Sequence, residues 1–179
     1  MRITISGPPG SGKTTVCDKL SSALSFKAVV FGKIFRELAE ERGLTLSELG
    51  EMAEKDFSID ELIDSRLVQI ARENDDIVLE SRLAAYMLTR NNIPAFKVYL
   101  DASIDVRVKR IGVRDNETFA EALIKTAERQ SSEQKRYKKY YGIDINDTKV
   151  YDMTINTDHT EADDVAKMII AALEAKGCL

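Results

Sequence analysis

Gly7-Pro8-Pro9-Gly10-Ser11-Gly12-Lys13-Thr14 matches the phosphate-binding template G-x-x-x-x-G-K-[ST] at every specified position. Residues 2–6 before it alternate and are β-branched, which predicts a strand, and residues 15–24 after it carry apolar side chains at helical spacing. The motif therefore lies between a strand and a helix, the setting in which it binds phosphate. A glycine-rich turn without a ligand is the alternative.

The chemistry of this loop follows from its residues. The glycines let successive backbone N–H groups point into one concavity, and the helix that starts near Lys13 adds the positive end of its dipole. Lys13 supplies a full charge at the β- and γ-phosphates of a nucleotide, and the Thr14 hydroxyl can bind Mg²⁺. The residues expected to hold these phosphates are Gly7, Pro8, Pro9, Gly10, Ser11, Gly12, Lys13, Thr14 and Thr15.

The composition limits the classes of function. The chain has 179 residues, of which 44% are hydrophobic and 31% charged, and its net charge is −4, so it is expected to be a globular protein that does not bind nucleic acid or membrane. Its two cysteines lack metal-ligand spacing, and His159 falls in a polar turn where we expect a surface residue. No apolar run is long enough to span a membrane, and the first strand leaves no room for a signal peptide. We expect a cytoplasmic monomer.

Strand and helix patterns alternate along the chain. Apolar and β-branched runs predict five strands, at 2–6, 27–31, 76–81, 95–100 and 152–155. Helical periodicity predicts helices at about 13–24, 33–41, from 45, at 58–73, 83–90, from 103, at 118–141 and at 161–175, and capping boxes at Thr45–Glu48, Ser58–Glu61 and Thr118–Glu121 open three of them. We therefore predict a single α/β domain, 1–179, with a five-stranded parallel sheet covered by helices on both faces.

Three of these helices fall between the second and third strands, where one would complete the crossover. The second strand is expected to end at Gly32, and the surplus predicts a helical insert, about 33–73, beside the sheet. Extra packing on one sheet face is the alternative. Within the insert, Asp60, Asp64 and Arg66 could position a ribose or base, but we favour a charged surface.

Charged residues gather where the predicted strands end, which is where ligands bind to such sheets. Arg36 and Arg82 follow two of the strands and can each grip a phosphate bidentately, and Glu80 can organise Mg²⁺ and its waters. Arg107, Arg110 and Arg114 recur on one helical stripe, in a segment that we interpret as a short basic flap over a triphosphate. The alternatives are that these arginines are ordinary surface residues and that Glu80 caps a helix or forms a salt bridge with Arg82.

Arg129, Glu133 and Arg136 form a second stripe, at i, i+4 and i+7. This spacing also suits an ordinary surface salt-bridge ladder. The chemistry nevertheless fits a cytosine edge, because a carboxylate accepts a hydrogen bond from the N4 amino group and arginine donates to the ring acceptors or to a phosphate. Uracil, with a carbonyl in place of the amino group, would face Glu133 badly.

With these residues in place, the whole chain resembles the nucleoside monophosphate kinases, and specifically the archaeal type of cytidylate kinase. The resemblance is carried by 3–12, 34–36 (IFR), 82–84 (RLA), 94–98 (PAFKV), 136–138 (RYK) and 141–144 (YGID). The pattern Arg129-x-x-x-Glu133-x-x-Arg136 is similar to the Arg-x-x-x-Asp-x-x-Arg that holds CMP in the bacterial enzymes. Ser81 stands where glycine is expected and Lys33 where an acidic residue is common, which puts the base or ribose contacts of that segment in question.

The resemblance implies transfer of the γ-phosphoryl group of ATP, with Mg²⁺, to CMP or dCMP. It also implies a monophosphate-binding insert at about 33–73 and a lid at about 107–117. The expected catalytic residues are Lys13, Arg110 and Arg114; the expected CMP-binding residues are Arg36, Arg82, Arg129, Glu133 and Arg136; the expected metal-binding residues are Thr14 and Glu80. A kinase for AMP, UMP or shikimate remains the alternative, and so does a nucleotide-hydrolysing switch, although the guanine-reading Asn-Lys-x-Asp is absent.

Overall fold

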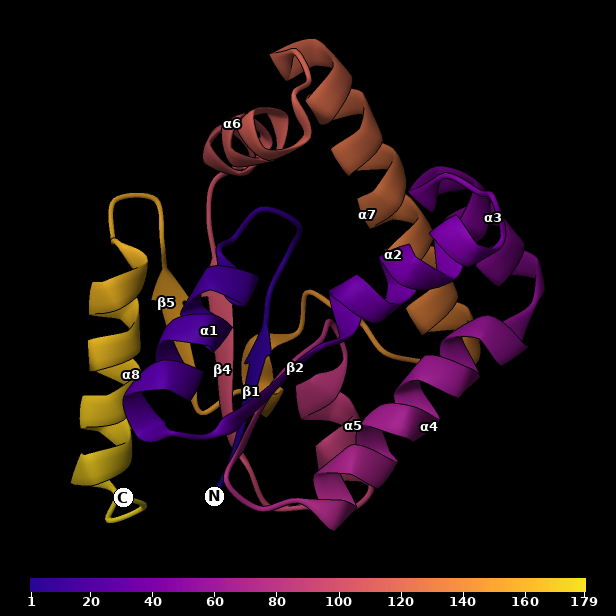
Figure 1. Ribbon diagram of the computed structural model, residues 1–179. Helices are drawn as coiled ribbons and strands as arrows, with labels where there is room; N and C mark the ends of the chain where they lie inside the picture. The colour runs from indigo at the N-terminus through magenta and orange to yellow at the C-terminus, as the bar shows by residue number, and fades with distance from the viewer.

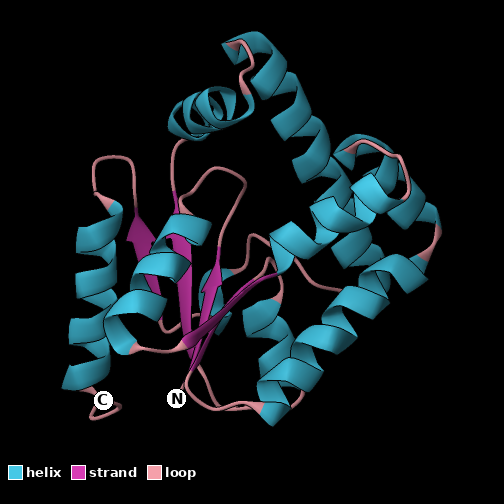
Figure 2. Ribbon diagram, viewed as in Figure 1, coloured by secondary structure: helices cyan, strands magenta, loops and turns pink.

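The computed structural model describes all 179 residues and has the predicted parallel sheet at its centre (Figures 1 and 2). The five strands lie in the order β2-β3-β1-β4-β5, and every pairing is parallel. Their bounds are β1 (Arg2–Ser6), β2 (Lys27–Val30), β3 (Ile77–Glu80), β4 (Phe96–Asp101) and β5 (Met153–Asn156). The predicted fold class is therefore confirmed.

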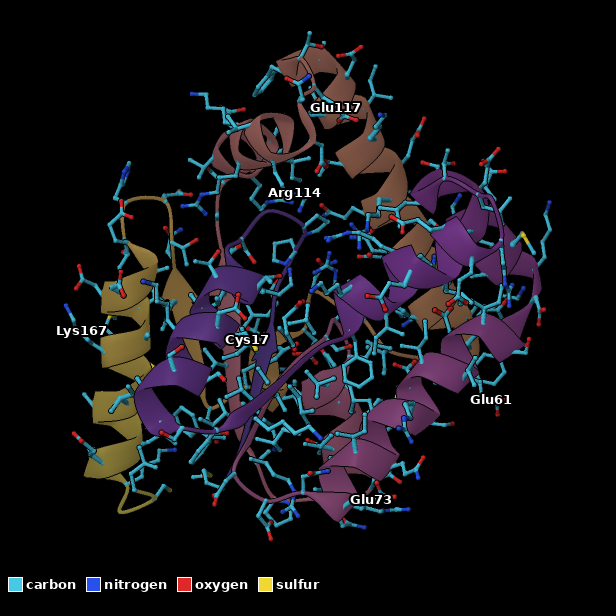
Figure 3. The ribbon with its side chains drawn as sticks, viewed as in Figure 1. Cys17, Glu61, Glu73, Arg114, Glu117 and Lys167 are labelled. Atoms are coloured by element: carbon cyan, nitrogen blue, oxygen red, sulfur yellow. The ribbon has the colours of Figure 1, made fainter.

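Helices cover both faces of the sheet, which explains the continuous apolar character of its central strands. On one face α1 (Lys13–Leu24) and α8 (Ala162–Ala175) pack through Leu20 and Ile169. On the other face α4 (Phe57–Glu73) and α5 (Ala84–Arg90) pack through Leu67 and Leu88. Cys17 is fully buried on the side of α1 that faces the sheet (Figure 3), as expected for a small core residue.

The expected three helices between β2 and β3 are present as α2 (Phe31–Glu41), α3 (Leu46–Lys55) and α4. They surround a small core of their own, which contains Ala39, Leu49, Ala53 and Ile59. Beside the sheet they form a separate wall (Figure 1). We call residues 31–73 the insert.

Two predicted boundaries in this region are wrong. Pairing of β2 with β3 ends at Val30, so nothing holds Phe31 extended, and α2 begins there with Gly32 inside its first turn. The capping box predicted at Ser58 does not form, because Asp56 caps α4 by accepting from the Ser58 backbone N–H at 3.0 Å. The capping boxes at Thr45 and Thr118 are confirmed.

Two helices after β4 form an arm that rises above the carboxyl ends of the strands (Figure 1). They are α6 (Ile104–Asp115) and α7 (Phe119–Tyr141), which pack through Val108, Ile111 and Ala122. Helix α7 has 23 residues and ends at Gly142, whose φ of 63° is the left-handed conformation typical of a helix terminator. Its last turns contact α3 of the insert, so one helix joins the arm to the insert.

The remaining connections are short. A 3₁₀ turn at Thr148–Val150 precedes β5. The structure contains no helix with the length and hydrophobicity needed to cross a membrane.

Candidate active site

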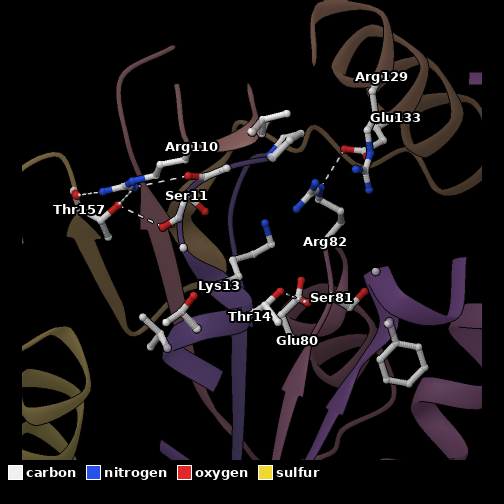
Figure 4. A pocket seen from close by; sticks show the side chains of 18 of the residues that line it. Ser11, Lys13, Thr14, Glu80, Ser81, Arg82, Arg110, Arg129, Glu133 and Thr157 are labelled. Carbon is white, nitrogen blue, oxygen red and sulfur yellow. Dashed lines mark hydrogen bonds and ion pairs between the residues drawn. The ribbon is translucent and has the colours of Figure 1, made fainter. Parts of the chain in front are cut away.

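A cavity of about 900 Å³ lies at the carboxyl ends of the strands, where parallel α/β sheets bind their ligands. The P-loop (residues 7–14) forms its floor, the insert forms one wall, and the turn from β5 to α8 forms the opposite wall. Helices α6 and α7 close it from above. Figure 4 shows side chains from the P-loop, from the end of β3, from α6 and α7 and from the β5–α8 turn around Lys13.

The P-loop is built for close backbone approach. Gly10 and Gly12 have φ values of 81° and 90°, which side chains other than glycine rarely adopt. Lys13 is only 7% exposed, and its Nζ donates to the Pro8 carbonyl oxygen at 2.8 Å. Burial lowers the pKa of Lys13 well below its ordinary value, and the positive charge of Arg82 lowers it further. An anionic phosphate would offset both effects, so Lys13 is prepared for one.

Arg107 supports this loop from behind. Its guanidinium is buried and donates to the Pro9 oxygen at 3.1 Å and to the Ala102 oxygen at 3.0 Å. A Cβ on Gly10 would lie 2.6 Å from the Arg107 carbonyl oxygen, so α6 presses directly on the loop. Of the three arginines in the predicted stripe, this one holds the P-loop in place and is absent from the main cavity's lining.

Arg110 and Arg114 line the cavity from α6. Arg110 donates through Nη2 to the Thr157 carbonyl oxygen at 2.6 Å and through Nη1 to the Thr157 Oγ1 at 3.0 Å (Figure 4). Arg114 donates through Nε and Nη2 to the two carboxylate oxygens of Asp115, each at 2.6 Å. Both guanidiniums therefore have protein partners in this structure.

Thr14 and Glu80, the expected metal ligands, lie side by side. The Thr14 hydroxyl donates to Glu80 Oε2 at 3.2 Å, and the Glu80 side chain is buried at the end of β3 facing the cavity. One hydroxyl and one carboxylate next to a phosphate loop fit Mg²⁺, which prefers oxygen ligands and keeps several waters. No group of three or more His, Cys, Asp or Glu side chains could form a protein-only metal cage.

The guanidinium of Arg36 reaches the cavity from α2 and makes no hydrogen bond or ion pair within the protein. Burial lowers the pKa of Arg36, and the positive charges of Arg114 and Arg129 lower it further, against the opposing charges of Asp115 and Glu80. Such mutual repulsion is relieved by an anion. This group of Arg36, Arg114 and Arg129 is therefore suited to a phosphate.

Glu133 holds two further arginines in place from α7. Its Oε2 accepts from Arg82 Nε at 2.8 Å and its Oε1 from Arg129 Nε at 3.1 Å (Figure 4). Burial would raise the pKa of Glu133, but Arg82 and Arg129 outweigh it and lower the pKa to about 2. Arg82 also donates through Nη1 to the Gly7 oxygen at 2.6 Å, which connects α7 to the P-loop.

Arg136, the last member of the second stripe, forms an ion pair with Asp60 at 2.8 Å. The structure brings Asp60 and Asp64 into the cavity wall with only 5% and 8% of their surfaces exposed. The expectation that they are surface charges is wrong. Each directly follows a buried or partly buried isoleucine of α4. These apolar neighbours were the signal for burial in the sequence, but the many charged residues around them favoured a surface position. Arg66 is exposed, as expected.

Sequence reasoning missed the cavity wall formed by the β5–α8 turn. Thr157 is buried there, and its hydroxyl donates to the Ser11 oxygen at 3.1 Å. His159 is exposed, as expected, but lies at the rim of the cavity. Thr157 contacts Ser11, 146 positions away in the sequence, and Arg110, 47 positions away, so no local pattern could have placed it at the site.

The chain is similar in sequence to known proteins over nearly its whole length. A model of the cytidylate kinase-like family matches residues 2–159. A cytidylate kinase from Sulfurisphaera tokodaii is 46% identical over 97% of this chain and 95% of its own length. One from Methanosphaerula palustris is 43% identical over 98% of both chains.

Solved structures share the fold at low identity. A shikimate kinase from Bacteroides thetaiotaomicron has a TM-score of 0.62 and 17% identity, and it covers 97% of this chain and 98% of its own. A shikimate kinase from Acinetobacter baumannii, in complex with shikimate, has a TM-score of 0.60 and 19% identity over 98% of this chain and 93% of its own.

Proposed function

We propose, from the premise that the chain belongs to the cytidylate kinase-like family, that it transfers the γ-phosphoryl group of ATP to CMP or dCMP. The products are ADP and CDP or dCDP. We further propose that it acts in the cytoplasm as a monomer, with no nucleic-acid or membrane partner.

The observation that carries this proposal is the free guanidinium of Arg36. It faces Arg114 and Arg129 in the same cavity as the P-loop, and no protein carboxylate binds it. The P-loop already provides a site for one nucleotide's phosphates, so this second cationic group calls for a second phosphate-bearing ligand. A kinase that phosphorylates a nucleoside monophosphate brings together two such ligands.

Each group of residues has a part in the transfer. The P-loop with Thr15 holds the ATP phosphates; Lys13, Arg110 and Arg114 neutralise charge on the moving phosphoryl group. Arg36, Arg82, Arg129, Glu133 and Arg136 hold CMP. Mg²⁺, held by Thr14 and Glu80, would supply positive charge at the ATP phosphates. The acceptor phosphate is already ionised, so positioning replaces base catalysis.

The insert and the lid segment (about 107–117) flank the cavity. Closing both over the substrates would exclude water, so the phosphoryl group would go to CMP and would not be hydrolysed. A hydrolysing switch, in contrast, must admit water without an acceptor.

The test is ADP release from ATP with CMP, dCMP, UMP, AMP or shikimate as acceptor, and with no acceptor. We expect turnover with CMP or dCMP and negligible ADP release without an acceptor. Preference for AMP or shikimate would replace cytidylate as the substrate, and fast release without any acceptor would favour the switch.

A matched pair of variants tests the carrying observation. Arg36→Ala should raise KM for CMP by about tenfold or more, because a charge-assisted phosphate contact contributes roughly 1.5–3 kcal/mol. Arg42→Ala, an exposed position at the end of the same helix, should leave it unchanged. Equal KM values for the two variants would remove Arg36 from the CMP site.

A further inference from the structure

Two carboxylates on one helix of the insert face the cavity without a full set of partners. Asp60 and Asp64 lie one turn apart on α4, and both are more than nine-tenths buried. Phe35, Ile63 and Tyr137 line the cavity beside them. Flat and apolar side chains around two polar groups are suited to an aromatic ring that carries hydrogen-bonding groups on its edge.

Each carboxylate has one oxygen engaged and one free. Asp60 Oδ2 accepts from Arg136 Nε at 2.8 Å, and Asp64 Oδ2 accepts from the Tyr141 hydroxyl at 2.7 Å. Neither Oδ1 accepts a hydrogen bond from the protein. Neither Oδ1 is one of the buried polar atoms that lack a partner, so both are accessible from the cavity and can accept a hydrogen bond from a ligand that donates one.

We propose that Asp64, assisted by Asp60, selects the base of the acceptor nucleotide by accepting a hydrogen bond from the exocyclic amino group of cytosine. The assignment rests on the proposed function and names the part of the same cavity that reads the base. A carboxylate accepts well from an amino group, whereas the carbonyl oxygen of uracil at the same place would meet a second acceptor. The chemistry therefore favours cytidine over uridine nucleotides.

Glu133 is less suited to this role than the sequence indicated. Both of its oxygens are engaged by arginines, and its charge is balanced by Arg82 and Arg129. Around Asp60 and Asp64, by contrast, Arg136 is the one cation that pairs with either carboxylate. The carboxylate oxygens that remain free to accept a hydrogen bond are those of Asp60 and Asp64 on α4. Glu133 therefore positions guanidiniums, and Asp64 reads the base.

The selection depends on the protonation of Asp64. Burial, together with the charge of the neighbouring Asp60, raises the pKa of Asp64 to about 7 against the opposing effects of the Tyr141 hydroxyl and Arg136. The Tyr137 phenol faces the same group from α7. A protonated Asp64 carboxyl donates a hydrogen bond, which the carbonyl oxygen of uracil can accept. The preference for CMP over UMP should therefore weaken as the pH falls through about 7.

The decisive measurement is the ratio of kcat/KM for CMP to that for UMP, at about pH 8, in wild type and Asp64→Asn. We expect the variant to lower this ratio by about tenfold or more, since one base-edge contact supports discrimination of that order. KM for ATP should not change. Glu61→Gln makes the same charge change on the exposed side of α4 and should leave the ratio unchanged.

An Asp64→Asn ratio within about twofold of wild type would overturn the inference while leaving the cytidylate kinase proposal standing. A wild-type protein with no preference for CMP would overturn both. The wild-type ratio measured from about pH 5.5 to pH 8.5 needs no variant to fold, and the ionisation of the acceptor phosphate cancels between CMP and UMP. A ratio that falls with decreasing pH supports the inference, and a flat ratio overturns it.

Discussion

Replacement of Gly10 by alanine tests how tightly the P-loop is fitted against α6. The new Cβ would lie 2.6 Å from the Arg107 carbonyl oxygen and 2.9 Å from the Arg107 Cα. These are backbone atoms of a helix, which cannot rotate away as a flexible side chain would. Gly12 provides the control, because its φ is also positive but a Cβ there would meet nothing within 4 Å.

The two variants separate conformational strain from steric overlap. Alanine in the left-handed region costs roughly 1–2 kcal/mol at either position. At Gly10 the overlap with Arg107 adds roughly 1–3 kcal/mol, as overpacking of an interior does. We therefore expect a loss of stability of about 2–5 kcal/mol for Gly10→Ala and about 1–2 kcal/mol for Gly12→Ala.

Thermal unfolding followed by circular dichroism measures the difference. For a chain of this length 1 kcal/mol shifts Tm by roughly 2–4 °C, so Gly10→Ala should melt about 4–20 °C below wild type and Gly12→Ala about 2–8 °C below. Equal losses for the two variants, or a larger loss at Gly12, would refute the contact between the P-loop and α6.

Three further predictions concern charged residues of the cavity. Lys13→Ala should lower kcat by about a hundredfold or more without a large change in Tm, because the ammonium donates to a single protein oxygen; near-normal kcat would exclude Lys13 from the reaction. Glu133→Ala should raise KM for CMP far more than KM for ATP in steady-state kinetics, because Arg82 and Arg129 lose the carboxylate that positions them; equal changes would contradict this. Asp64→Asn should stabilise the protein against urea by up to about 4 kcal/mol near pH 8 and far less near pH 4. The raised folded-state pKa, about 7, makes ionised Asp64 destabilising as pH rises from 3.8, and a pH-independent difference would contradict this.

Local chemistry made much of the fold predictable. The P-loop between a strand and a helix, the capping boxes at Thr45 and Thr118, and the terminating Gly142 each depend on a few adjacent residues. The alternation of strands and helices then leaves little choice of topology. The sequence could therefore predict the parallel sheet and the position of the cavity.

The incorrect predictions concern positions whose structure is determined by residues distant in the sequence. At the start of α4, Asp56 and Ser58 are both good caps, and the Phe57 ring packs against those of Tyr140 and Tyr141 at the end of α7. Arg107 was grouped with phosphate-binding arginines because spacing shows a common stripe but not that its end reaches the Pro9 oxygen.

Asp60 was misjudged for the same reason. Its partner, Arg136, lies on a different helix 76 positions later, so periodicity within α4 favoured solvent. The cytosine contacts assigned to Arg129, Glu133 and Arg136 stay a prediction.

Helix α7 connects the arm to the insert and is attached to both. Its N-terminal turns pack on α6 through Ala122, and its last turns are fastened to the insert, where the Tyr140 hydroxyl hydrogen-bonds the Ala53 and Glu54 carbonyl oxygens at 2.8 Å. Arg129 lies between these two attachments. A rigid rod fixed at both ends cannot tilt toward one ligand without carrying the opposite end along. Binding of either nucleotide should therefore move both the arm and the insert toward the cavity, so the two nucleotides should bind synergistically.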